Sequence, residues 1–202
     1  MSACTEGFAV SCTGELESGV GALRREQELN RFFADVEARA LRIAEIAVRN
    51  REDALDLVQD AMIRLVRNYA DRDREEWTPL FYRILQNRVR DFQRRQNVRN
   101  RVIAWFGRSS DPEDDYDPIA AAPDPDGRTP DESLESQEAM QELERALAAL
   151  PARQREAFML RNFEGLDVAQ TAAAMGISDG SVKTHYSRAV HSLRDTLGEH
   201  WS

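Results

Sequence analysis

Hydrophobic residues recur every three or four positions over two long stretches of this chain, residues 28–103 and residues 133–198. That period is typical of amphipathic helices that turn one apolar face toward a core. The first expected helix carries the stripe Phe33, Val36, Ala40, Ile43 and Ala47. Alternation of apolar and polar residues, which would indicate strands, is almost absent. The pattern therefore predicts an all-α protein with two small helical domains.

Two more apolar stripes follow in the first of these stretches. One consists of Ala54, Leu57, Val58, Ala61 and Leu65, and the next of Phe81, Leu85, Val89 and Phe92. The helix with the later stripe starts near Trp77-Thr78-Pro79, where proline suits the first turn. Stripes of this kind can cover one another, so we expect residues 28–103 to fold as one domain.

The C-terminal stretch ends in the most specific pattern of the chain. A short helix is expected over Val168–Met175, Gly176 permits a tight turn, and Ser178 suits an N-cap. The final helix has the stripe Val182, Tyr186, Ala189, Leu193 and Leu197. Ala172 leaves room where the two helices cross. Residues 133–198 are thus expected to contain a helix-turn-helix with residues 178–197 as its recognition helix; the alternative is a hairpin that packs only internally.

The composition changes abruptly between the two domains. Residues 111–130 hold five prolines and one glycine among their acids, without a helical or strand period. We expect residues 104–132 to be a flexible acidic linker. Residues 1–27 show no clear stripe, so we expect an N-terminal extension that is disordered or weakly helical.

Charge is distributed very unevenly along the 202 residues. The net charge of −9 seems to argue against nucleic acid as a partner. Residues 108–142, however, hold twelve acids and two arginines and carry −10 alone, which leaves +1 for the rest. Within that remainder, residues 83–101 hold seven arginines and one acid, a local charge of +6. The acidic balance therefore belongs mainly to the linker and hides a basic block.

Several classes of protein are excluded by what the sequence lacks. It has no apolar run long enough for a membrane span and no signal-peptide pattern, so we expect a cytoplasmic protein without membrane insertion. Cys4 and Cys12 alone cannot build a disulfide framework or a four-cysteine zinc site, and unrelated thiols are favoured over a redox pair. We find no phosphate loop, nucleophile elbow or metal-ligand motif. We therefore expect no cofactor, no metal and no enzymatic activity.

The second expected helix has a polar face opposite its apolar stripe. This face consists of Asp56, Gln59, Asp60 and Ile63. A solvated surface is one interpretation of such a pattern. An exposed branched aliphatic among hydrogen-bonding groups is also typical of a docking surface for a protein partner.

The third expected helix has a cationic face, with two aromatic residues close by. Its candidate nucleic-acid contacts are Trp77, Tyr82, Arg83, Asn87, Arg90, Arg94 and Arg95. Arginines can neutralise phosphates, asparagine can hold a base edge and aromatic rings can stack on an unpaired base. A solvated surface is again the alternative, but the density of arginines favours nucleic acid.

The expected recognition helix exposes hydrogen-bond donors on the side away from its apolar stripe. They are Ser181, Lys183, Thr184, Ser187 and Arg188. Such side chains suit phosphates and the base edges of the major groove.

Four groups of residues together resemble bacterial sigma factors of the sigma-70 family, in the small extracytoplasmic-function group. They are Asp53-Ala54-Leu55-Asp56-Leu57-Val58-Gln59-Asp60; Leu80 to Asn87 with Asp91 and Arg94-Arg95; Leu147 to Glu156; and Gly176-Ile177-Ser178 through Val182-Lys183. The resemblance covers about residues 28–198 and implies a region 2 domain followed by a region 4 domain.

The resemblance also implies partners for each face. The face around Asp56 would bind core RNA polymerase, and the arginine face would bind the −10 element of promoter DNA, with Asn87 near an extruded base. Lys183 and its neighbours would bind the −35 element, and the linker would thread the polymerase channels. Leu80 stands where the family often has tryptophan. An anti-sigma factor is implied as a further partner. The rival interpretation is a self-sufficient regulator that binds DNA as a symmetric dimer through its helix-turn-helix.

Overall fold

The computed structural model describes residues 12–105 and 130–198, and within them every regular element is an α-helix. The helices are α1 (Cys12–Val48), α2 (Arg51–Tyr69), α3 (Arg74–Trp105), α4 (Pro130–Ala149), α5 (Ala152–Asn162), α6 (Val168–Met175) and α7 (Asp179–Leu197). The predicted all-α class is confirmed. The central part of the predicted linker, residues 106–129, lies outside the described residues, and so do residues 1–11.

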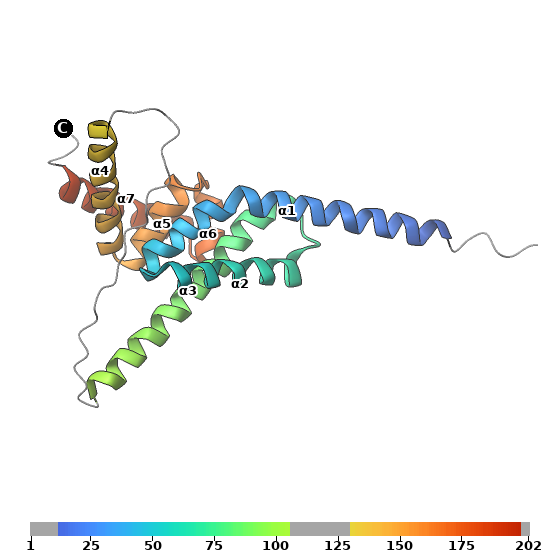
Figure 1. The fold of residues 1–202 in the computed structure, drawn as a ribbon, viewed down its shortest axis with the longest axis horizontal. Coiled ribbons are helices and arrows are strands. Elements are labelled where there is room, and N and C mark those ends of the chain that lie inside the picture. The colour runs from blue at the N-terminus through green and yellow to red at the C-terminus, as the bar shows by residue number, and fades with distance from the viewer. Residues whose placement is uncertain (1–11, 106–129, 199–202) are drawn as a thin grey trace, which may run out of the picture.

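The N-terminal half of the protein, α1 to α3, is a three-helix bundle (Figure 1). The chain leaves α1 through Arg49, which takes the left-handed conformation at φ 59°, and Asn50 then caps α2 by accepting from the backbone N–H of Asp53 at 2.9 Å. Phe32 and Phe81 meet edge to face in the core, with ring centroids 6.0 Å apart. This aromatic contact joins α1 to α3.

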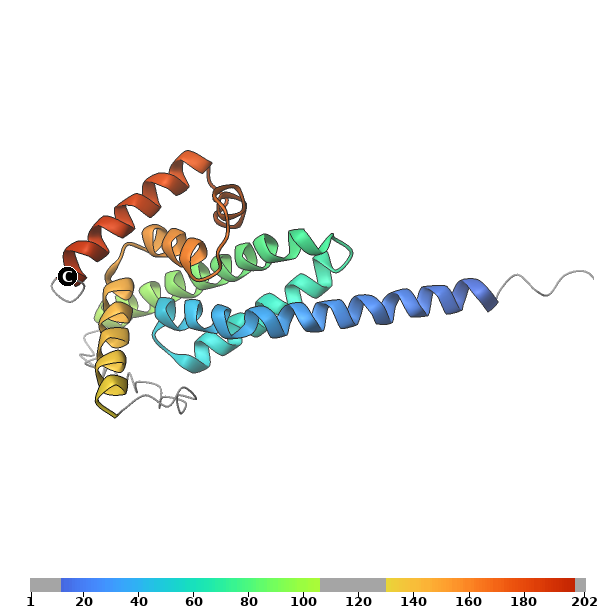
Figure 2. The same ribbon diagram turned by 90° about the horizontal axis from the view of Figure 1, so that it is seen from above.

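The first helix is longer than the sequence pattern predicted. It begins at Cys12, so residues 12–27 are helical and the expected boundary at residue 28 is not an element boundary. In both views α1 extends well beyond the rest of the bundle (Figures 1 and 2). This segment contains no proline to interrupt the helix. Arg25 anchors it by donating to the backbone carbonyl oxygens of Ala70 and Arg72, at 2.7 and 3.3 Å.

The C-terminal half, α4 to α7, owes its short helices to well-formed caps. Pro151 precedes α5, and Asp167 begins α6 with a capping box in which it exchanges hydrogen bonds with Gln170. Gly176 ends α6 in the left-handed conformation, at φ 66°. Ser178 then caps α7 through the backbone N–H of Ser181. The capping and turn residues Asp167, Gly176 and Ser178 thus set the boundaries of the two helices of the helix-turn-helix.

The two halves pack against each other. α6 lies against α3, and α4 lies against α1. Buried residues of both halves form one hydrophobic cluster, and Figure 2 shows α5 beside α3. None of the helices in the described ranges has the length and apolar character that a membrane span requires.

Candidate nucleic-acid interface

The polar face predicted on the second helix lies on the outer side of α2. Its exposed side chains are those of Asp56, Gln59 and Ile63, and Ile63 keeps 49% of its surface exposed. Asp60 is half-buried because its carboxylate contacts Arg64, at 3.1 Å, and Arg88 of α3. The face therefore combines an exposed aliphatic side chain with side-chain oxygens that can accept hydrogen bonds, which is the chemistry of a protein-docking surface.

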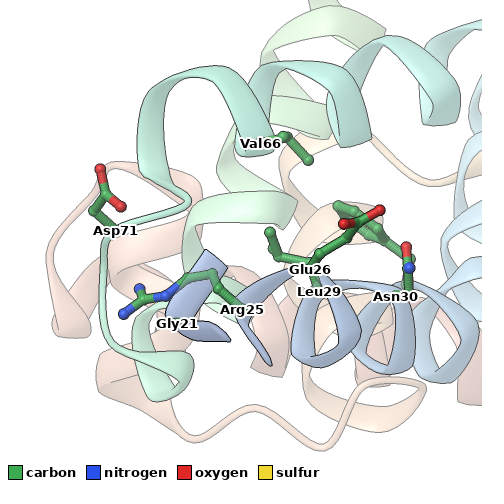
Figure 3. A pocket seen from close by; sticks show the side chains of 8 residues that line it. Gly21, Arg25, Glu26, Leu29, Asn30, Val66 and Asp71 are labelled. Carbon is green, nitrogen blue, oxygen red and sulfur yellow. The ribbon is translucent and has the colours of Figure 1, made fainter. Parts of the chain in front are cut away.

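An open groove adjoins this face between the beginning of α1 and the end of α2 (Figure 3). Its volume is about 630 Å³. Val66, one turn after Ile63, lines it from α2, while Leu29 and Phe33 line it from α1. Val66 is 43% exposed. The apolar part of the α2 surface thus continues past Ile63 into the groove.

The cationic face predicted on the third helix is present on α3. Arg83, Asn87, Arg94 and Arg95 are exposed, whereas Arg90 is half-buried. Arg90 donates to the side-chain oxygen of Asn87 at 3.0 Å, and Arg94 pairs with Asp91 at 3.2 Å. The Arg94–Asp91 pair is exposed and contributes little to stability, so the guanidinium group of Arg94 is available to a polyanion.

The expectation that Trp77 stacks on a base beside this face is wrong for this conformation. Its side chain is only 1% exposed. The ring packs against Phe32, with centroids 5.7 Å apart, and its Nε1 donates to the backbone oxygen of Tyr69 at 3.1 Å. The indole is therefore a core residue that closes the turn between α2 and α3.

The same expectation for Tyr82 is also wrong in this arrangement, because its side chain is fully buried. It packs edge to face on Phe81, with ring centroids 5.2 Å apart. Burial raises the pKa of the phenol well above its usual value, and the nearby carboxylate of Glu164 raises it further. Since Glu164 belongs to the C-terminal half, that half contributes to the surroundings of Tyr82.

The donor face predicted on the recognition helix is exposed on α7. Lys183, Thr184, Ser187 and Arg188 are exposed. Ser181 is half-buried, and its hydroxyl lies 2.9 Å from that of the capping Ser178. Ser181 therefore serves the start of the helix, and the four exposed side chains form the part of the face that can approach DNA.

The orientation of α7 depends on buried contacts with α5 and α6. Val182 and Ala189 are fully buried, and Tyr186 stacks on Phe158 of α5 with centroids 6.2 Å apart. Thr171 of α6 is fully buried, and its hydroxyl donates to the backbone oxygen of Asp167 at 2.6 Å. A polar residue is tolerated there because its donor is satisfied within its own helix.

Two buried carboxylates of the C-terminal half were not found by sequence reasoning. Glu156 is 5% exposed, and the side chain of Glu164 is 1% exposed. Burial raises the pKa of Glu156, and the opposing effects of Arg90 and Arg153 do not restore its usual value. No local pattern marks Glu164, because it meets Arg39, which lies 125 positions away in the sequence.

Comparisons with known proteins agree with the order of the two halves. Residues 31–99 match the family model described as Sigma-70 region 2, and residues 140–193 match the one described as Sigma-70, region 4. The first match lies within α1 to α3, and the second spans α4 to α7.

Curated proteins with similar sequences carry sigma-factor names. The chain is 35% identical over 179 residues to the ECF RNA polymerase sigma factor SigE of Mycolicibacterium smegmatis, which covers 87% of this chain and 62% of that protein. It is 32% identical over 158 residues to the RNA polymerase sigma-E factor of Streptomyces avermitilis, with 78% of each chain covered. The chain thus spans less than two thirds of the first relative's length.

Solved structures with a similar fold come from complexes of two proteins. The sigma factor RpoE of Bartonella quintana, in complex with the anti-sigma factor NepR, matches with a TM-score of 0.55 and 26% identity over 83% of this chain and 97% of that one. CnrH, in complex with the cytosolic domain of CnrY, shares the fold with a TM-score of 0.54, 18% identity and coverage of 85% and 88%.

Proposed function

The chain belongs to the extracytoplasmic-function group of the sigma-70 family, and from that premise we propose that it is a promoter-specificity subunit of RNA polymerase. In this role it binds core polymerase, positions two DNA-reading surfaces on a promoter and helps to open the strands. The observation that carries the proposal is the presence, in one chain, of an exposed arginine face on α3 and an exposed donor face on a helix-turn-helix.

The α3 face is proposed to bind the −10 element. Arg83, Arg94 and Arg95 can neutralise phosphates of the non-template strand, and the exposed amide of Asn87 can hold the edge of an extruded base. Unstacking a base costs a few kcal/mol, which such contacts can offset. This function needs no covalent chemistry from the chain.

The α7 face is proposed to read the −35 element in the major groove. Lys183 and Thr184 lie in the N-terminal half of the helix, which is the part of a recognition helix that usually reaches base edges. Ser187 and Arg188 follow one turn later and suit phosphates. We expect base discrimination to depend mainly on the first pair.

The α2 face is proposed to bind core polymerase, with Ile63 as its apolar centre and Asp56, Gln59 and Asp60 around it. Charged and amide groups around a buried aliphatic anchor give both affinity and orientation. The anti-sigma factor bound to the structural relative RpoE motivates a further proposal, that this chain also has a protein inhibitor.

Transcription with purified components tests the proposal. The protein is added to core RNA polymerase with a library of genomic fragments from its host, and transcripts are mapped by their 5′ ends. We expect initiation at a shared motif only when the protein is present. The absence of protein-dependent initiation on every fragment would refute the proposal.

Matched variants connect this activity to the surfaces. Replacement of Lys183 and Arg188 by alanine should abolish initiation from the mapped promoters while leaving core binding intact. Replacement of Thr196 by alanine, also exposed on α7 but near its other end, should leave initiation unchanged. Tight binding of an isolated dimer to duplex DNA without polymerase would instead favour the self-sufficient regulator.

A further inference from the structure

The half-buried side chain of Tyr186 on α7 is held by three residues of one other helix. Its ring stacks on that of Phe158, with centroids 6.2 Å apart and 16° between the ring planes. The guanidinium carbon of Arg161 lies 5.9 Å from the centre of the tyrosine ring. The phenol hydroxyl donates to Oδ1 of Asn162 at 3.3 Å. All three partners belong to α5, which therefore contacts a single side chain of α7 through a ring, a cation and an amide.

The partners of Tyr186 are themselves fixed by hydrogen bonds to the backbone. Asn162 donates through Nδ2 to the backbone oxygen of Phe158 at 3.1 Å, which leaves its Oδ1 as the acceptor for the phenol. Arg161 donates through Nη1 to the backbone oxygen of Leu166, in the turn between α5 and α6. A change in the position of the tyrosine ring would therefore disturb contacts on both sides of this turn.

Tyr186 lies beside the α7 face that is proposed to read DNA. It follows Lys183 by three positions, which places the two side chains about 60° apart around the helix axis. Because the helix moves as one body, the angle at which Tyr186 is held also sets the direction of Lys183 and Thr184. The burial of Val182 and Ala189 contributes a non-directional apolar contact. The stacked ring and the hydroxyl hydrogen bond have preferred geometries, so they fix the rotation of α7 more closely.

The rotation of α7 matters more for base readout than for general attraction to DNA. A hydrogen bond to a base edge weakens steeply when its angle or length changes. The attraction between a cation and a phosphate falls only gradually with distance. A small rotation of the recognition helix would thus reduce the discrimination between base pairs while leaving the affinity for unrelated DNA almost unchanged.

We propose that Tyr186 is a positioning residue for base readout, because its contacts with α5 set the rotation of α7 about its axis. Tyr186 itself makes no contact with DNA in this role. Lys183 and Thr184 contact the bases, at the angle that Tyr186 sets. This inference rests on the function proposed for α7 and assigns part of the −35 specificity to a residue outside the exposed donor face.

The test uses holoenzyme reconstituted from core polymerase and the full-length protein. Binding is measured on a mapped promoter and on versions in which each −35 base pair is changed in turn. At the most sensitive position, the wild type should prefer the mapped promoter by about tenfold. Tyr186→Leu keeps an apolar side chain and a good helix former, and should reduce this preference to about twofold. Its affinity for unrelated duplex DNA should not change, since Lys183 and Arg188 keep their charges.

Two smaller changes separate positioning from a direct contact with DNA. Tyr186→Phe and Asn162→Ala each remove one side of the hydroxyl hydrogen bond, and each should reduce the preference to about fivefold. The double variant should lose no more than either single variant. A hydroxyl that contacted a phosphate would instead weaken binding to every sequence in Tyr186→Phe, and Asn162→Ala would then have no effect.

Val190→Ala is the matched control for a simple loss of packing. Val190 is half-buried on α7, one turn after Tyr186. This variant should lower Tm, measured by circular dichroism, as Tyr186→Leu does, but it should keep the wild-type preference for the mapped promoter. The comparison therefore distinguishes a role in stability from a role in setting the angle of the helix.

Three results would overturn the inference: an unchanged preference in Tyr186→Leu, an equal loss of preference in Val190→Ala, or effects of Tyr186→Phe and Asn162→Ala that add. The first of these, with a wild type that discriminates normally, leaves the function proposed for α7 intact. If the wild-type holoenzyme prefers no base pair at any −35 position, the function proposed for α7 fails and the inference fails with it.

Discussion

Replacement of Gly176 by alanine should lower the stability of the C-terminal half, although the new methyl group meets nothing. Gly176 has φ 66°, and a Cβ atom built there has no other atom within 4 Å. The cost is therefore conformational, because the left-handed region is unfavourable for an L-residue by about 1–2 kcal/mol. Alanine also restricts the unfolded chain more than glycine does, which offsets about 0.4–1 kcal/mol of that cost. We expect a net loss of about 1 kcal/mol in the free energy of unfolding, by the difference of those ranges.

The same substitution at Gly180 is a matched control with the opposite expected sign. Gly180 lies in the first turn of α7 with helical backbone, and a Cβ atom there also has open space. Alanine is the better helix former, so the variant should gain about 0.5 kcal/mol. Because the position is exposed, no packing change should intervene.

Thermal unfolding monitored by circular dichroism measures both variants. A change of 1 kcal/mol corresponds to a shift of about 2–4 °C in Tm for a chain of this size. Gly176→Asn, which tolerates the left-handed region better than alanine, should lie between the wild type and Gly176→Ala. Equal shifts of the same sign for the two alanine variants would refute the assignment of the turn glycine.

Three further predictions concern the surfaces and the buried carboxylate. Ile63→Asp should abolish co-purification with core polymerase without a change in Tm, since the side chain is 49% exposed. Replacement of Arg188 by alanine should reduce the slope of log affinity against log salt on a mapped promoter by about 1, because this side chain is the proposed phosphate contact, whereas loss of base readout alone would leave the slope unchanged. Burial holds the pKa of Glu156 above its usual value, so the folded state takes up this proton before the unfolded state does. Protonation of Glu156 therefore adds to the stability of the folded state as the pH falls from 7 through the raised pKa of this group. We expect the free energy of unfolding of the wild type minus that of Glu156→Gln, measured by urea unfolding above and below this pKa, to be larger at the lower pH. A difference that stays constant with pH would contradict the prediction.

The helices themselves could be predicted from the sequence because their signals are local. The stripe Ala54, Leu57, Val58, Ala61 and Leu65 is the buried side of α2. Gly176 and Ser178 adopt the turn and cap conformations that their side chains favour. The exposed positions Asp56 and Lys183 follow from the same periodicity, since the side opposite an apolar stripe faces solvent.

The predicted exposure of aromatic side chains is wrong where a helix is contacted on more than one side. α3 packs against α1 and α2 on one side and against α6 on another, so its apparent outer aromatic, Tyr82, is buried. The position of Trp77 near the arginines predicts an exposed ring, but the ring is covered by Phe32, which belongs to a different helix. Residues 12–27 lack a stripe because α1 extends past the bundle there, and a helix without a covered face leaves no periodic signal.

The sequence alone determined the helical class, the helix-turn-helix, the family and the residues that carry charge on each helix. Those properties depend on spacing along the chain, on caps and on turn residues, all within a few positions. Only the tertiary structure decided that Arg90 meets Glu156, that Arg39 meets Glu164 and that the two halves share one core. Such contacts join residues far apart in sequence. The attraction between such charges is larger away from water, but it offsets the cost of desolvation only when the geometry is good, and that geometry is a property of the assembled surface that no short stretch of sequence contains.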